Sequence, residues 1–270
     1  MGCASSSNKD PVDQPHGGGS GGGGGDDYGD EDDYQPLTQE EVNARIQCSD
    51  KPTLYNFPAK GLTLRYAYLS QRGYYPEDLY KANQDAFKII PKFNGKAETM
   101  FMGVFDGHGS DGDSCSYFVR DNIEKHLKKT MEKYPEDFEK AFKMSFINCN
   151  LDMHDQKFDD SMSGTTAIAV YFSNTEITVA NIGDSRAIVG ERKGKRIIAY
   201  SLSIDQTPYR ADERERVKAA GAVVMSCDQL EGIVPFHENW GVNLGEELDN
   251  GGDPPRVWQP GKSFPGCAFT

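Results

Sequence analysis

Two neighbouring stretches of helical spacing, with strand-like stretches before and after them, restrict the fold of this chain more than any other feature. Apolar residues recur every three or four positions over residues 115–131 and again over 138–153. This spacing predicts two amphipathic helices. Pro135, followed by Glu136 and Asp137, is typical of the first turn of a helix and predicts where the second one begins.

Alternating or continuous apolar residues predict strands on both sides of the helix pair. The predicted strands cover residues 62–68, 99–105, 165–172, 176–182, 186–190 and 196–202, with a hairpin through Gly183 and Asp184. A further helix is predicted over residues 211–220, ended by Gly221, and its Glu213–Arg216 run predicts a solvated helix face. The order of these elements predicts an α+β fold rather than βαβ alternation.

The first part of the chain differs from the rest in composition. Residues 1–50 hold two basic and eleven acidic side chains and ten of the 29 glycines. Such a segment cannot bury enough apolar surface to offset its ordering entropy. We predict that residues 1–58 form a disordered tail and that residues 59–270 form the globular domain.

The N-terminal residues carry a lipidation pattern. Met-Gly-Cys-Ala-Ser-Ser fits N-myristoylation at Gly2, although an unmodified tail is the alternative. One myristoyl chain binds membranes only marginally, and the acidic run over residues 26–33 is repelled by anionic lipid. Palmitoylation of Cys3 is therefore the available second signal, and we expect a cytoplasmic protein that is membrane-associated through this lipid.

Composition excludes several classes of function. The net charge of −13 argues against a nucleic-acid partner, which requires a basic surface. The six cysteines are widely spaced and form no CxxC pair, which indicates a reducing compartment without disulfides or a zinc site. The longest uncharged apolar run, residues 165–172, is too short to cross a bilayer as a helix.

Three aspartates stand at the ends of apolar stretches. Asp106 lies in Met-Gly-Val-Phe-Asp-Gly-His-Gly, Asp184 lies in Val-Ala-Asn-Ile-Gly-Asp-Ser-Arg, and Asp85 precedes a further apolar stretch. Taken singly, Asp-Gly and Gly-Asp are ordinary hairpin residues. The two glycines that flank His108 let the backbone approach a ligand closely. Carboxylates and carbonyls without a His/Cys cluster suit hard ions such as Mg²⁺ or Mn²⁺.

These segments make the chain resemble the metal-dependent protein serine/threonine phosphatases of the type 2C family. The matching segments are 83–87, 101–109, 163–167, 179–187 and 202–224, in the family's order. The resemblance covers residues 60–270 and implies an α-β-β-α sandwich, with antiparallel sheets flanked by helices. Segments 82–85, 205–208, 254–258 and 265–270 are closer still to plant and algal proteins that fuse such a phosphatase to cyclic-nucleotide-binding and kinase domains.

The resemblance implies a metal centre of two or more Mg²⁺ or Mn²⁺ ions. Asp106 matches the aspartate that bridges two ions, and the carbonyl of Gly107 completes one ion's shell. Asp85 matches an acidic residue near the metals, and Asp184 matches the aspartate of a third, weaker site. Gln84 departs from the family, which often has glutamate at this position.

The resemblance also implies the reaction. Water activated by the metal attacks the phosphorus of phosphoserine or phosphothreonine in phosphoprotein substrates, and His108 matches the general acid. Arg72 is matched to the family's phosphate-binding arginine. Because the family continues beyond the match to Thr270 with further metal ligands, we expect a C-terminally truncated chain that is inactive alone. A catalytically incompetent module that binds phosphoproteins is the alternative function.

Overall fold

The structure is a computed structural model that describes residues 38, 40, 45–58, 61–73, 75, 78, 80–174, 176–240 and 252–270. Gly2, Cys3 and most of the predicted tail lie outside the described residues. The predicted α+β fold is confirmed. Its centre is an antiparallel sheet in the order β5-β6-β8-β9, with β7 paired to β6. These strands are β5 (Asp85–Pro91), β6 (Thr99–His108), β7 (Gly164–Thr165), β8 (Ala167–Ser173) and β9 (Glu176–Ile182).

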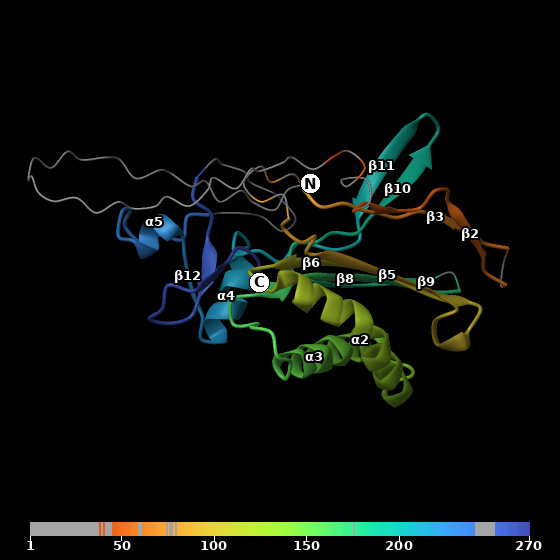
Figure 1. The fold of residues 1–270 in the computed structure, drawn as a ribbon, viewed down its shortest axis with the longest axis horizontal. Coiled ribbons are helices and arrows are strands. Elements are labelled where there is room, and N and C mark those ends of the chain that lie inside the picture. Colours follow the sequence, from red (N-terminus) through yellow and green to blue (C-terminus); the bar gives the residue numbers. More distant parts are fainter. Residues whose placement is uncertain are drawn as a thin grey trace, which may run out of the picture.

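The two predicted helices cover one face of this sheet, as Figure 1 shows. They are α2 (Gly112–Lys133) and α3 (Phe138–His154). Asp137 caps α3 by accepting a 2.9 Å hydrogen bond from the backbone N–H of Lys140, which satisfies one of the free donors of the first turn. Both helices turn their apolar stripes toward the sheet.

Strand β6 shows how the period of two divides its side chains between the two faces. Phe101 and Phe105 are fully buried and belong to the main apolar core with Ile123 and Leu127 of α2. Val104, on the opposite face, is half exposed. The core therefore lies between the sheet and the helix pair. No helix in the described part of the chain is long and apolar enough to span a membrane.

The remaining strands form small antiparallel sheets. Strands β2 and β3 form one ribbon and strands β10 and β11 form another, both on the side of the large sheet away from α2 and α3 (Figure 1). The elements are β1 (Gln47–Cys48), β2 (Thr53–Asn56), β3 (Thr63–Tyr66), β4 (Leu69–Ser70), the 3-10 turn η1 (Phe93–Gly95), β10 (Ile188–Lys193), β11 (Arg196–Ser201), α4 (Ala211–Ala219), β12 (Val223–Met225), α5 (Cys227–Leu230), β13 (Arg256–Trp258) and β14 (Pro265–Cys267).

The boundary predicted at residue 58 differs from the structure. Residues 47–48 and 53–56, assigned to the tail from composition, form β1 and β2. Strand β2 pairs with β3, and Phe57 is buried against Tyr55 and Phe172, with ring centroids 4.9 and 6.1 Å away. Apolar residues close to Gly61 thus join the domain, because pairing with β3 supplies the partners that the isolated segment lacks.

Two predicted turns also differ. Asp106 and Gly107 do not end their strand, because β6 continues to His108 while β5 and β7 pair with this end. Strand β9 forms no hairpin with β10, which pairs with β11. Instead, the carbonyl of Gly183 accepts a 2.9 Å hydrogen bond from the N–H of Gln206, and the chain leaves the large sheet there.

Helix α4 corrects the prediction of a solvated face. Glu213 and Arg214 are buried. Arg214 donates hydrogen bonds to the carbonyls of Pro208 and Tyr209, at 3.0 and 2.6 Å, and Arg216 binds the Glu213 carboxylate at 2.7 Å. These bonds fold the preceding loop onto the helix and withdraw Glu213 and Arg214 from water, whereas Glu215 and Arg216 are exposed as predicted.

Candidate functional site

The centre of the site is a pair of aspartates on adjacent strands. Asp85 of β5 lies directly opposite Asp106 of β6 in the antiparallel register. Side chains at directly opposite positions share one face of a sheet, and like charges there repel each other. A divalent cation between the two carboxylates removes that repulsion, so the arrangement suits a hard metal ion.

Gly107 brings the start of α2 against this pair. A Cβ atom at Gly107 would lie 2.1 Å from the carbonyl oxygen of Gly112 and 2.5 Å from that of Gln84, so no other residue fits. The N–H of Gly107 donates a 3.1 Å hydrogen bond to the carbonyl of Gln84, which also accepts a 2.6 Å bond from the Ser116 hydroxyl. Close backbone packing thus fixes the segment that carries Asp106.

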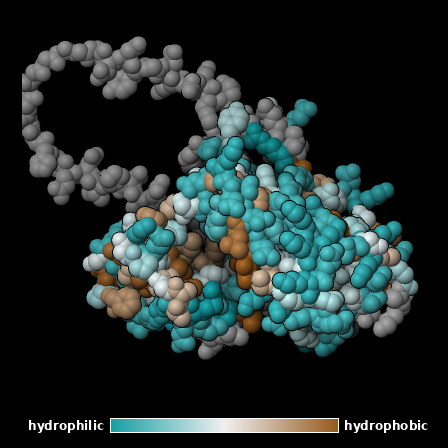
Figure 2. All heavy atoms as spheres, turned by 90° about the horizontal axis from the view of Figure 1, so that it is seen from below, coloured by the Kyte–Doolittle hydropathy of each residue, from teal (hydrophilic) through white to brown (hydrophobic). Residues whose placement is uncertain are grey.

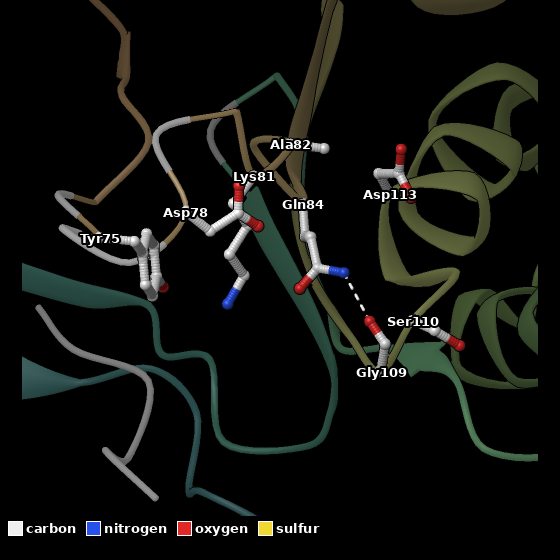
Figure 3. Close-up of a pocket in the computed structure, with 8 residues that line it drawn as sticks. All are labelled: Tyr75, Asp78, Lys81, Ala82, Gln84, Gly109, Ser110 and Asp113. Carbon is white, nitrogen blue, oxygen red and sulfur yellow. Dashed lines mark hydrogen bonds between the residues drawn. The ribbon is translucent and has the colours of Figure 1, made fainter. Parts of the chain in front are cut away.

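The side chain of Gln84 is engaged as well. Its Nε2 donates a 2.6 Å hydrogen bond to the carbonyl of Gly109 (Figure 3). A glutamate carboxylate cannot donate this bond. The departure from glutamate noted in the sequence therefore coincides with a contact that ties the loop after β6 to the start of β5.

Thr166 connects the Asp106 strand to the loop that holds Asp184. Its Oγ1 accepts a 3.1 Å hydrogen bond from the N–H of Asp106 and lies 2.6 Å from the Ser185 hydroxyl. The N–H of Thr166 donates in return to the carbonyl of Asp106 at 2.9 Å. The residue next to Asp184 is thus held beside the aspartate pair.

His108, at the end of β6, is enclosed on two sides. It pairs with Gly164 of β7, where a Cβ atom would lie 2.7 Å from the imidazole Nε2. The ring of Phe269 meets the imidazole edge-on, with centroids 4.8 Å apart. Burial lowers the pKa of His108 from its ordinary value, because the charged form is less well solvated there.

A pocket of about 540 Å³ opens beside Gln84, the residue that precedes Asp85 (Figure 3). Its lining includes Lys81, which precedes Asp85 by four residues and points its amine into the pocket between Tyr75 and Gln84. The Lys81 amine rests 3.9 Å from the centre of the Tyr75 ring, a favourable cation–π arrangement. The full lining is Tyr75, Asp78, Lys81, Ala82, Gln84, Gly109, Ser110 and Asp113.

Arg72 is held by main-chain atoms behind this pocket. Its guanidinium donates hydrogen bonds to the carbonyls of Lys81, at 2.7 Å, and Asp78, at 3.3 Å. Arg72 is the residue that the sequence matches to a phosphate-binding arginine, whereas Lys81 is the basic side chain that lines the pocket. The signal that identifies Lys81 is its position in the segment Lys-Ala-Asn-Gln-Asp, directly before β5.

The next question is whether the side chains around Asp85 and Asp106 can hold the Mg²⁺ or Mn²⁺ that the sequence implies. Within the described residues no group of three or more His, Cys, Asp or Glu side chains lies close enough to hold an ion. The cross-strand pair of Asp85 and Asp106 still offers hard oxygen ligands of the type that Mg²⁺ and Mn²⁺ prefer. The residues therefore fit such an ion in kind, with two carboxylates as the protein's contribution.

Comparison with known proteins identifies the family of the chain. The family profile described as Protein phosphatase 2C matches residues 78–236, and the chain belongs to this family. It is 45% identical over 233 residues to Probable protein phosphatase 2C 35 of Arabidopsis thaliana, covering 85% of this chain and 66% of the relative. It is 28% identical to Protein phosphatase 1L of Bos taurus over 169 residues, which cover 59% of this chain and 42% of that protein.

Among solved structures, the chain is similar to a serine-threonine phosphatase 2C from Toxoplasma gondii, with 19% identity and a TM-score of 0.48. That match covers 64% of this chain and 55% of the other. The chain thus spans less than two thirds of the length of these relatives.

Proposed function

We propose that the protein hydrolyses phosphoserine and phosphothreonine esters in phosphoprotein substrates by direct attack of water. The observation that carries this proposal is the opposition of Asp85 and Asp106 across β5 and β6. The residue before Asp85, Gln84, lines a pocket that also holds the cationic side chain of Lys81. Membership of the protein phosphatase 2C family supports it. Mg²⁺ or Mn²⁺ held at these carboxylates supplies Lewis-acid chemistry, which activates water and offsets phosphoryl charge.

The chain's own residues have distinct roles in this proposal. Lys81 binds a phosphoryl oxygen with its ammonium group, since charge-assisted hydrogen bonds are the strong ones. Arg72 positions the main chain of Lys81 and does not contact the substrate itself. His108 holds a proton on its imidazole and gives it to the leaving oxygen, a step that positioned side chains accelerate. Asp184, whose neighbour Ser185 contacts Thr166, adds a further carboxylate near Asp85 and Asp106 in this proposal.

Phosphate release from a phosphoserine peptide tests the proposal, with millimolar Mn²⁺ and with EDTA. The 270-residue chain and the product of its whole reading frame are assayed side by side. We expect Mn²⁺-dependent release by the longer product, lost in Asp106→Asn. If Asp106→Asn leaves the rate unchanged, the proposed metal centre is wrong.

A phosphoprotein-binding module without turnover is the second candidate. It is favoured by the absence, among the residues that the structure describes, of a group of three or more metal-binding side chains, and by Gln84, whose amide is committed to Gly109. In that case both polypeptides bind the phosphopeptide, and neither releases phosphate from it when Mn²⁺ is added.

We also propose that Gly2 is myristoylated and Cys3 palmitoylated, and that the whole protein continues into cyclic-nucleotide-binding and kinase domains. The N-terminal pattern supports the lipids, and the segments shared with plant and algal fusion proteins support the domains. In fractionated eukaryotic cells Gly2→Ala should move the protein from membranes to the soluble fraction. The size of the native protein tests the added domains.

A further inference from the structure

An apolar groove lies on the helix side of the molecule and shares no lining residue with the pocket that contains Lys81. It has a volume of about 350 Å³ and opens between α2, α3 and the ends of β7, β8 and β9. Figure 2 looks onto this side and shows hydrophobic side chains gathered in a hollow. The lining is Val119, Ile123, Phe146, Ile147, Cys149, Asn150, Leu151, Met153, Thr165, Ala167 and Ile182.

The chemistry of the groove selects an apolar ligand. Its floor is buried core, whereas the rim residues Ile147, Leu151 and Ile182 are 42%, 57% and 41% exposed. No charged side chain lines it, and the amide of Asn150 already contacts His154 at 3.1 Å. A phosphate, a carboxylate or a charged peptide finds no partner there, so the groove fits a flexible hydrocarbon chain.

The rest of the sequence offers one source of such a chain. Residues 1–37 contain few large apolar side chains of their own, namely Met1, Val12, Tyr28, Tyr34 and Leu37. The largest apolar group that this segment can carry is therefore the acyl chain on Gly2. We propose that the groove binds the myristoyl group of the same polypeptide, an inference that rests on the lipidation proposed above.

Gly2 precedes Arg45, where the continuous described chain begins, by 43 residues. A chain of this length spans at most about 140–155 Å when fully extended, so its length does not prevent the acyl group from reaching the groove. A tethered ligand of this kind has an effective concentration on the order of millimolar. A groove of modest affinity is therefore filled from within the molecule.

Binding of the acyl chain in the groove shifts the equilibrium between the membrane-bound and the free protein toward the free protein. A single myristoyl chain binds bilayers weakly, so occupancy of the groove keeps the singly acylated protein off the membrane. A second acyl chain on Cys3 cannot share a groove of this size, and it shifts the protein to the bilayer. The groove thus makes membrane attachment depend on the state of Cys3.

The test uses the 270-residue chain produced with and without an N-myristoyltransferase, with acylation verified by mass spectrometry. Melting temperature and the methyl NMR signals of Ile147, Leu151 and Ile182 are compared. We expect acylation to raise the melting temperature by a few degrees and to shift these methyl signals. Leu151→Glu, at an exposed position, should cancel both effects and raise binding to phosphatidylcholine vesicles several-fold. Ile188→Glu, 62% exposed on β10, is the matched control and should behave as the wild type.

Three results overturn the proposal. Verified acylation that leaves the methyl signals unchanged shows that the groove is not the site, while lipidation stands. Absence of acylation by the transferase refutes the lipidation itself and the groove proposal with it. Effects that grow with protein concentration assign the groove to the acyl chain of a second copy and contradict the intramolecular contact.

Discussion

Arg72 and Lys81 are joined by a 2.7 Å hydrogen bond from the Arg72 guanidinium to the Lys81 carbonyl. This bond fixes the backbone from which the Lys81 side chain enters the pocket, while the ring of Tyr75 supports its amine at 3.9 Å. Lys81 is thus held both at its backbone and at its amine. In the proposed function Arg72 acts through Lys81, so replacing Lys81 removes the charge in the pocket while leaving the Arg72 side chain in place.

Replacing Lys81 tests the proposed contact with the phosphoryl group. Lys81→Met should lower kcat/KM for a phosphoserine peptide roughly 10- to 100-fold, since a hydrogen bond to a charged group contributes about 1.5–3 kcal/mol. Lys81→Arg should recover much of this loss because it restores the positive charge. Lys96→Met, at an exposed position after η1, is the control. Equal losses in the Met and Arg variants would contradict the electrostatic role.

Gln84→Glu tests the bond to the loop after β6. The carboxylate cannot donate to the carbonyl of Gly109, and it adds a third negative charge next to Asp85. In EDTA we expect the melting temperature to fall by roughly 2–4 °C for each kcal/mol lost. Added Mn²⁺ should raise it more in the variant than in the wild type, because the site has gained a carboxylate. Differential scanning calorimetry measures both values, and an unchanged melting temperature in EDTA would show that the amide bond is dispensable.

The sequence predicted local elements well and missed contacts made by the tertiary fold. The two helices follow from apolar spacing alone, because packing on a sheet requires that stripe. The opposition of Asp85 and Asp106 depends on strand register, which a single sequence does not specify. Lys81 was missed because it lies in a loop without periodicity. Glu213 is buried, and the hydroxyl of Thr270, 57 residues along the chain, donates to its carboxylate; such a long-range contact is not visible in the local charge pattern.

His126 predicts how stability depends on pH. It is buried in α2, and its Nε2 lies 3.3 Å from the carboxylate of Asp152 on α3. Burial lowers its pKa, Asp152 opposes this shift, and Lys125 and Lys129 add to it. The unfolded chain therefore binds the proton more readily than the folded one.

As pH falls below the ordinary histidine value of about 6.5, the free energy of unfolding should decrease until the folded-state pKa is passed. His126→Gln should flatten this dependence between pH 7.5 and 5.5 in urea unfolding. A residual slope should remain from His108, whose pKa is also lowered by burial. An identical slope in the variant and the wild type would exclude His126 as its source.

Gly164→Ala tests the enclosure of the proposed general acid. The new Cβ atom would lie 2.7 Å from Nε2 of His108, so the imidazole has to move away from its place between β7 and Phe269. General acid catalysis contributes about 10²- to 10⁴-fold to the rate. Because the displaced imidazole loses part of this contribution, we expect kcat for a phosphoserine peptide to fall at least about tenfold. The loss should be smaller for p-nitrophenyl phosphate, whose leaving group needs less protonation.

Gly252→Ala is the matched control, because a Cβ atom there meets nothing within 4 Å. Circular dichroism and melting temperature establish that the variant is folded. Equal losses for the two substrates in a folded variant would mean that His108 does not deliver the proton.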